Sequence, residues 1–165
     1  VLTTAAKAEL ASPEAMALAH RLMTTLNKAA RDCMVRYAVH ACTDVTGFGL
    51  LGHAFEMAQA SDTHLTLFPG EIDLIPEALE LARDGILPAG MYRNRHYAEA
   101  AVDPGSTELA VQDMLYDPQT SGGLLIAAAP EDADALLREL RGAVPSAQRI
   151  GVVEAYSGGP RISLR

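Results

Sequence analysis

The sequence predicts an α+β domain with a mixed, largely antiparallel sheet packed by helices. Segments with apolar residues at helical spacing alternate with short apolar runs typical of strands, but without the regular spacing of βαβ units. The chain also finishes on two short strand patterns around the turn 157–160, which is the clearest hairpin signal in the sequence. Its 165 residues can form one domain with a real core, and since aromatic residues make up only 5%, that core must be aliphatic.

Helix-start and helix-stop signals place the helices in order. Ser12 is expected to cap a helical region that runs to about residue 36, with Pro13 at its first position and a break near 24–25. Pro76 begins a later helix that Gly85 ends. Three other helices are expected at 50–58, at 107–115 with Ser106 as a plausible cap, and at 130–141, where Gly142 ends the helix.

Short apolar runs place the strands between these helices. They are expected at 37–42, 65–68, 124–129, 148–155 and 161–164, and the run at 124–129 indicates a buried strand. Residues 87–97 lack an apolar period and are expected to form a loop. Residues 1–11 are expected to be the remnant of an extended interdomain connector, which leaves 12–165 as the domain.

Composition excludes several classes of function. The formal net charge of −8 argues against a nucleic-acid or acidic-membrane surface, because phosphate binding on that scale requires a basic face. No apolar run approaches the ~20 residues of a membrane span, and no signal peptide is evident. Cys33 and Cys42 fit neither a disulfide framework nor a zinc site. We therefore expect a cytoplasmic protein with reduced thiols.

The first stretch with chemical potential runs from Thr43 to His53, with the sequence TDVTGFGLLGH. It joins a strand pattern to a helix pattern, and such a turn leaves unpaired N–H groups at the positive end of the helix dipole, a natural seat for an anion. Gly47 and Gly49 allow the backbone to approach a ligand closely. Thr46 can either cap the helix or donate to a phosphate oxygen.

Asp44 stands out in this stretch, because a carboxylate repels an anion unless a cation lies between them. That indicates Mg²⁺, which combines one or two carboxylates with phosphate oxygens and water. The alternative is that Asp44 only caps or satisfies the turn.

A dinucleotide-binding interpretation of the same stretch is also open. Gly47, Gly49 and Gly52 fit the G-x-G-x-x-G pattern, with Glu71 and Asp73 further along the chain. That pattern belongs to the first βαβ unit of a doubly wound sheet, whereas here a long helical region precedes it.

The second stretch runs from Asp117 to Ile126, with the sequence DPQTSGGLLI. It is rich in groups that can donate hydrogen bonds to a ligand, namely Gln119, Thr120 and Ser121, and Gly122 with Gly123 allows close approach. A hydroxyl-rich turn of this kind is also common where a chain simply begins a strand.

A third candidate is the polar cluster between Arg93 and Arg95, which flank Asn94. Two arginines beside an asparagine can bind an oxyanion by forked donation. A solvated loop with paired arginines explains the same pattern.

Together, TDVTGFGLLGH and DPQTSGGLLI resemble the C-terminal domain of the selenophosphate synthetase (selenide, water dikinase) family. The wider superfamily includes aminoimidazole ribonucleotide synthetase, thiamine-monophosphate kinase and a hydrogenase-maturation dehydratase. The resemblance implies the aminoimidazole ribonucleotide synthetase C-terminal-domain fold. It also implies a homodimeric enzyme that converts selenide, ATP and water to selenophosphate, AMP and phosphate.

The same resemblance assigns roles within this chain. Asp44 matches the Mg²⁺ ligand, whereas the Cys or selenocysteine nucleophile and its Lys are expected upstream, in an ATP-binding N-terminal domain. The chain alone is therefore expected to be inactive and to close the cleft over ATP and selenide. The residues implied to line the phosphate or selenide site are Thr43, Thr46, Gly47, Gly49, Arg93, Asn94, Gln119, Thr120, Ser121 and Gly122.

Two other functions remain open at this point. One is a different ATP-dependent member of the superfamily, a kinase or an amidine-forming synthetase. The other is a non-catalytic module that binds a small molecule or a partner.

Overall fold

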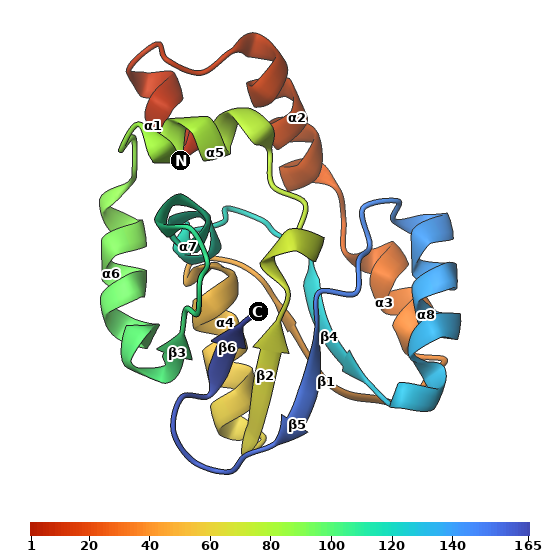
Figure 1. The fold of residues 1–165 in the computed structure, drawn as a ribbon. Coiled ribbons are helices and arrows are strands. Elements are labelled where there is room, and N and C mark those ends of the chain that lie inside the picture. The colour runs from red at the N-terminus through yellow and green to blue at the C-terminus, as the bar shows by residue number, and fades with distance from the viewer.

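The computed structural model describes all residues from 1 to 165 and confirms the α+β class. Six strands form two sheets, and helices surround them in three groups (Figure 1). Helices α1, α2 and α5 lie at the top of the view, α6 and α7 at one side, and α3 and α8 at the other. The expected single sheet is therefore divided in two.

The larger sheet has the order β3-β6-β2-β5. Its strands are β2 (Thr63–Leu67), β3 (Val102–Asp103), β5 (Gly151–Ala155) and β6 (Ile162–Leu164). β2 pairs antiparallel with β5 and parallel with β6, so it lies between them. The predicted C-terminal hairpin is wrong, because β2 buries Leu65 and Leu67 in the core and occupies the place between the two last strands.

The smaller sheet consists of β1 (Val39–Asp44) and β4 (Leu124–Ala128), paired antiparallel. One of its faces packs against α3 (Lys28–Met34) and α8 (Pro130–Ala143) through Leu124 and Ile126. Every residue of β4 is half-buried, so the expectation of a buried strand is wrong.

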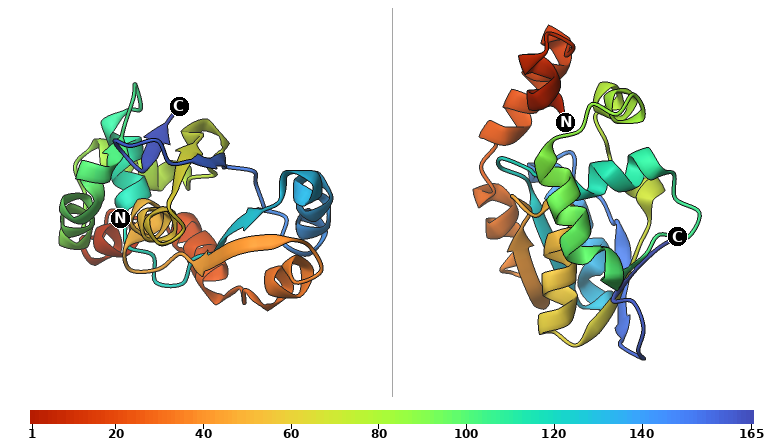
Figure 2. Two further views of the ribbon diagram at one scale, coloured as in Figure 1. Left: turned by 90° about the horizontal axis from the view of Figure 1, so that it is seen from below. Right: turned by 90° about the vertical axis from the view of Figure 1, so that its left-hand side faces the viewer.

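Helix α4 (Gly49–Ala60) is the central element of the fold. It contacts β1 of one sheet and β2 of the other, and Figure 2 shows it between the two sheets. Its fully buried Leu51 and Ala54 join a core with α6 (Ala89–Ala98) and α7 (Leu109–Tyr116). The N-terminus of α4 therefore has a fixed position relative to both sheets.

A second core joins α1 (Leu2–Lys7), α2 (Pro13–Thr24) and α5 (Pro76–Arg83). The first residues are thus helical rather than extended, because Leu2 and Ala5 bury their side chains against this group. Ser12 caps α2 as predicted, accepting from Ala15 N at 3.1 Å. The predicted break between α2 and α3 is also confirmed.

Three local predictions need correction. Residues 89–98 form helix α6 and not a loop, because Met91, Asn94 and Ala98 lie on one buried face of the helix. Asn94 is polar, so this face does not show the apolar periodicity by which a helix is predicted. Ser106 does not cap α7, whose N-cap position is Glu108, and α8 continues past Gly142 to Ala143.

Short 3₁₀ turns lie at Pro69–Glu71 and Glu99–Ala101. None of the helices combines the length and apolar character that crossing a membrane requires.

Candidate functional site

The two sequence motifs, far apart in the chain, form one continuous structure. Asp44 at the end of β1 pairs with Leu124 at the start of β4. Beyond these strands Val45 donates to Gly123 O at 2.9 Å, and Gly122 donates back to Val45 O at 3.0 Å. These hydrogen bonds extend the ladder of the small sheet. They hold the turn after β1 (residues 45–49, here called the first turn) next to the turn before β4 (residues 119–123, here called the second turn).

Two glycines allow these turns to interlock. Gly49 has φ +70°, and a Cβ there would lie 2.7 Å from the backbone carbonyl group of Tyr116. A Cβ on Gly122 would collide with the carbonyl oxygen of Val45. By contrast, a Cβ on Gly47 or Gly123 would meet nothing within 4 Å. The first pair is required by packing, whereas the second pair faces open space that a ligand can approach.

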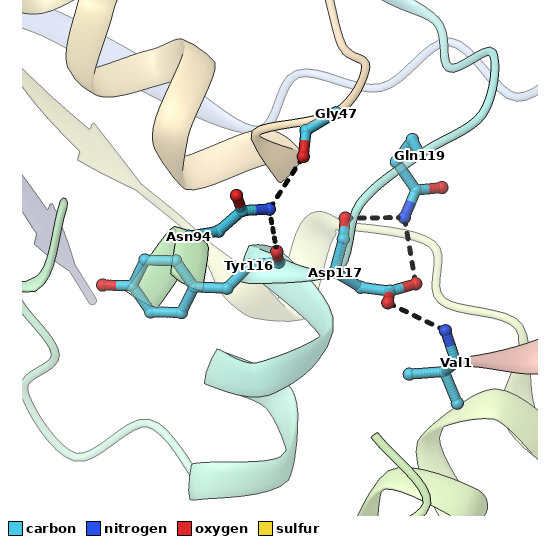
Figure 3. Close-up of polar contacts among 6 residues, drawn as sticks. All are labelled: Val1, Gly47, Asn94, Tyr116, Asp117 and Gln119. Carbon is cyan, nitrogen blue, oxygen red and sulfur yellow. Dashed lines mark hydrogen bonds and ion pairs between the residues drawn. The ribbon is translucent and has the colours of Figure 1, made fainter. Parts of the chain in front are cut away.

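Asn94 holds the first turn from the side of α6. Its amide nitrogen donates to Gly47 O and to Tyr116 O, both at 2.9 Å, and the residue is only 6% exposed (Figure 3). Both amide hydrogens are therefore used on backbone carbonyls. Arg93, the neighbouring residue on α6, is exposed and takes part in no ion pair. The structure thus separates two residues that the sequence pattern treated as one cluster.

Thr46 does not cap α4, which corrects one of its two expected roles. The N-cap residue is Phe48, and no side chain accepts a hydrogen bond in the first turn of the helix. The Thr46 hydroxyl lies instead 3.1 Å from Nε2 of His53, and Nδ1 of His53 lies 3.2 Å from Glu56. The backbone carbonyl of Thr46 accepts from Gly49 N and Gln119 N, so it too links the two turns.

Asp44 lies exposed at the last position of β1, and its carboxylate takes part in no hydrogen bond or ion pair. It shares the exposed positions of β1 with Cys42, whose pKa is raised by partial burial and by the charge of Asp44. No group of three metal-ligating side chains occurs in the chain. A free carboxylate beside the turn fits one place in a Mg²⁺ shell, and the other protein ligands would have to come from outside these residues.

A cavity of about 400 Å³ lies behind the second turn, and its wall is mostly apolar. Gln119, Thr120, Ser121 and Gly122 line it, but none of the expected polar residues of the first turn does. Asp117, also in its wall, accepts from the backbone nitrogen of Val1 at 2.8 Å and from Gln119 (Figure 3). Burial raises the pKa of the Asp117 carboxyl, although these two donors act in the opposite direction.

The predicted site residues therefore differ in position: some form the junction of the two turns, and others lie exposed or within β1. One group is the junction of the two turns, formed by Thr46, Gly49 and Gly122 with Asn94 behind them. The exposed positions close to it are Asp44, Gly47 and Thr120, and Arg93 is also exposed on α6. Thr43 is half-buried in β1, where its hydroxyl donates to Asp44 O at 3.2 Å.

The dinucleotide-binding interpretation is wrong. The strand before the glycine turn pairs antiparallel with β4 in a two-stranded sheet, whereas that fold requires a parallel, doubly wound sheet. Glu71 lies in a 3₁₀ turn after β2 and not at the end of a neighbouring parallel strand. Gly52 has a packing role instead, since a Cβ there would lie 2.6 Å from Cβ of Phe48.

Sequence reasoning missed three residues that support the site. Asn27, between α2 and α3, donates to Gly122 O at 3.0 Å, and no local pattern signals a contact across so much of the chain. His53 and Glu56 adjoin Thr46 as described above. Their spacing of three residues on one helix face is the signal that could have found them.

Comparison with known proteins gives a family and several relatives. The family described as "AIR synthase related protein, C-terminal domain" matches residues 2–161. A protein of Treponema denticola named "Selenide, water dikinase" is 43% identical over 140 residues, which is 85% of this chain and 40% of the relative. Proteins with the same name from Clostridium botulinum and Citrifermentans bemidjiense are 42% and 44% identical over 93% and 97% of this chain, and 45% and 46% of their own lengths. The chain thus spans less than half the length of these relatives.

Proposed function

The chain belongs to the C-terminal domain family of AIR synthase related proteins, and from that we propose that it is the C-terminal domain of a selenide, water dikinase. The resemblance drawn from the two motifs is confirmed, because relatives with this name match most of the chain. The proposed reaction of the complete protein converts selenide, ATP and water to selenophosphate, AMP and phosphate. In this protein the present domain closes the active-site cleft.

The observation that carries this function is the interlocking of the two turns. A ligand at this junction meets the open backbone of Gly47 and Gly123 and, on the second turn, the hydroxyl groups of Thr120 and Ser121. Backbone N–H groups and the dipole at the start of α4 favour a negatively charged group there. Arg93, exposed on α6, supplies a further cation for an anionic substrate.

Magnesium is part of the proposal, with Asp44 as one ligand. The ion would neutralise charge on the phosphoryl groups during transfer. Its other protein ligands, like the nucleophile and its lysine, belong to the N-terminal domain. We place the complete protein in the cytoplasm as a homodimer, with its own N-terminal domain as the partner of this one.

The substitution Asp44→Asn in the complete protein tests the metal assignment. It should abolish selenide-dependent turnover of ATP without lowering the unfolding temperature, because the Asp44 carboxylate makes no contact that folding requires. Asp134→Asn, which removes another exposed carboxylate from α8, is the matched control and should retain full turnover. Near-normal turnover in the Asp44 variant would remove the metal assignment.

The reaction itself is tested by phosphorus NMR of the complete protein, incubated without oxygen with ATP, Mg²⁺ and selenide. Selenophosphate and AMP are the expected products. ADP alone, or turnover that does not depend on selenide, would overturn the proposed reaction and indicate another ATP-dependent member of the superfamily.

A further inference from the structure

Three polar side chains form a row at the start of α4, joined by one hydrogen bond and one ion-pair contact. The Thr46 hydroxyl oxygen lies 3.1 Å from Nε2 of His53, and Nδ1 on the other side of the ring lies 3.2 Å from Oε2 of Glu56. His53 is only 8% exposed, whereas the side chain of Glu56 is 43% exposed. The row therefore runs from a partly exposed carboxylate, through a buried ring, to the first turn of the site.

Packing fixes the ring of His53 in this position. Phe48 folds back over the helix, with its ring centroid 5.5 Å from that of His53. It can do so because Gly52 has no Cβ, and a Cβ there would lie 2.6 Å from Cβ of Phe48. Tyr97 of α6 stacks on Phe48, with 5.5 Å between the two ring centroids. The imidazole is thus held by neighbours that make no hydrogen bond to it.

The direction of the hydrogen bond between Thr46 and His53 follows from the charge on the other side of the ring. A carboxylate has no hydrogen to donate and attracts an N–H dipole, so the ring nitrogen 3.2 Å from Glu56 carries the hydrogen. In a neutral imidazole the other nitrogen is then an acceptor, and Thr46 must donate its hydroxyl hydrogen to it. The lone pairs of the Thr46 oxygen are left for any group that approaches the first turn.

We propose that His53 and Glu56 are positioning residues that orient the Thr46 hydroxyl as a hydrogen-bond acceptor toward the ligand. The ligand atom at Thr46 is then electropositive, a metal cation or an N–H group, and not a phosphate oxygen. This changes the role expected from the sequence, in which Thr46 donates to phosphate. The inference depends on the proposed function only for the reaction that is assayed.

A second histidine provides a matched control. His96 and Glu99 have the same spacing of three residues on α6, but Nδ1 lies 3.8 Å from the carboxylate and the His96 side chain is 92% exposed. No hydroxyl group bonds to His96. Substitution of His96 by Phe therefore makes the same chemical change without interrupting a row of this kind.

The first test is nitrogen NMR of the complete protein with ¹⁵N-labelled histidine, in which the loss of a signal in His53→Phe assigns His53. We expect a hydrogen on Nδ1 and none on Nε2, with the Nε2 signal moving in Thr46→Val but not in Thr46→Ser. The opposite tautomer, or an Nε2 signal that Thr46→Val leaves unchanged, would overturn the proposal. This result is independent of any reaction, so it stands even if the proposed activity fails.

The second test is a double-mutant cycle on selenide-dependent kcat. Thr46→Val and His53→Phe should each reduce kcat by about three- to tenfold, the size expected for one lost hydrogen bond, and the double variant should be no slower than Thr46→Val. His53→Gln, whose carbonyl can accept from Thr46, should recover most of the loss, and His96→Phe should have no effect. If the kcat reductions of the two single variants multiply in the double variant, His53 acts independently of Thr46, and its positioning role is refuted. A fully active His53→Phe would refute it too.

Discussion

The first and second turns meet at one junction, but they are held in different ways. The first turn is fixed from three sides, by Gln119 N on Thr46 O, by Asn94 on Gly47 O, and by the backbone of Tyr116 against Gly49. The second turn is held at its ends, and the side chains of Thr120 and Ser121 between them make no hydrogen bond. A site can thus combine one rigid wall with one that adjusts to its ligand.

The elements next to the two turns also differ. The first turn joins α4 and the fully buried Leu51, in the main core. The second turn lies along the cavity of about 400 Å³, which gives its backbone room to move. Rigid elements position reacting groups more accurately, whereas a segment with few contacts can close over a substrate.

Substitution of the turn glycines should give the largest contrast. Gly49→Ala should lower the free energy of unfolding by about 2–4 kcal/mol, because alanine is strained at a positive φ and its Cβ meets the backbone of Tyr116. Gly123→Ala in the second turn should stay within about 0.5 kcal/mol, since its Cβ meets nothing within 4 Å. Denaturant unfolding of both variants measures the difference. Equal losses would contradict the contrast between the turns.

The two asparagines that bind turn carbonyls should give an intermediate effect. Asn94→Ala leaves one buried and one partly buried carbonyl oxygen without their donor and should cost about 1–3 kcal/mol of unfolding free energy. Asn27→Ala removes one partly buried bond to Gly122 O and should cost about 0.5–1.5 kcal/mol. Hydrogen exchange should show faster opening of the first turn in the Asn94 variant.

Arg93→Ala is the control for the Asn94 substitution. It lies beside Asn94 on α6 but is exposed, so its stability should stay within about 0.5 kcal/mol of the unsubstituted protein. A larger loss for Arg93→Ala than for Asn94→Ala would overturn the assignment of Asn94 as the residue that holds the first turn.

An effect that appears only at alkaline pH should come from Tyr116, against which the first turn packs. Burial raises the pKa of Tyr116 to about 12 from an ordinary value of 10.0. Between these values the unfolded chain has lost a proton that the folded chain keeps, so stability falls as pH rises, by about 1 kcal/mol per pH unit. Below pH 10 this contribution is fully present.

Unfolding free energies measured from about pH 9 to about pH 12 would test this dependence. Tyr116→Phe should flatten the slope, because phenylalanine has no proton to lose. An identical slope in the variant would show that the buried phenol does not govern the alkaline loss of stability.

Local pattern was enough for much of this protein. Ser12 and Pro13 placed the start of α2, and Gly85, with φ +78°, lies just past the end of α5 where it was expected. The order of strand, turn and helix around residues 43–53 was also predicted correctly, although the strand was expected at 37–42 and β1 extends to Asp44. These features depend on neighbours within a few residues, because capping and turn conformation are local interactions.

The arrangement in space was decided only by long-range contacts. The hairpin signal at 157–160 identified a turn correctly, since Gly158 and Gly159 both have positive φ, but not that β2 lies between the strands it joins. Helix α6 was not predicted because the polar residue Asn94 occupies a buried position. Its side-chain amide donates hydrogen bonds there to two backbone carbonyls of distant segments. The sequence alone indicated which segments are candidates for the site. The pairing of β1 with β4 decided that these segments lie together, because strand register is set by partners remote in the chain.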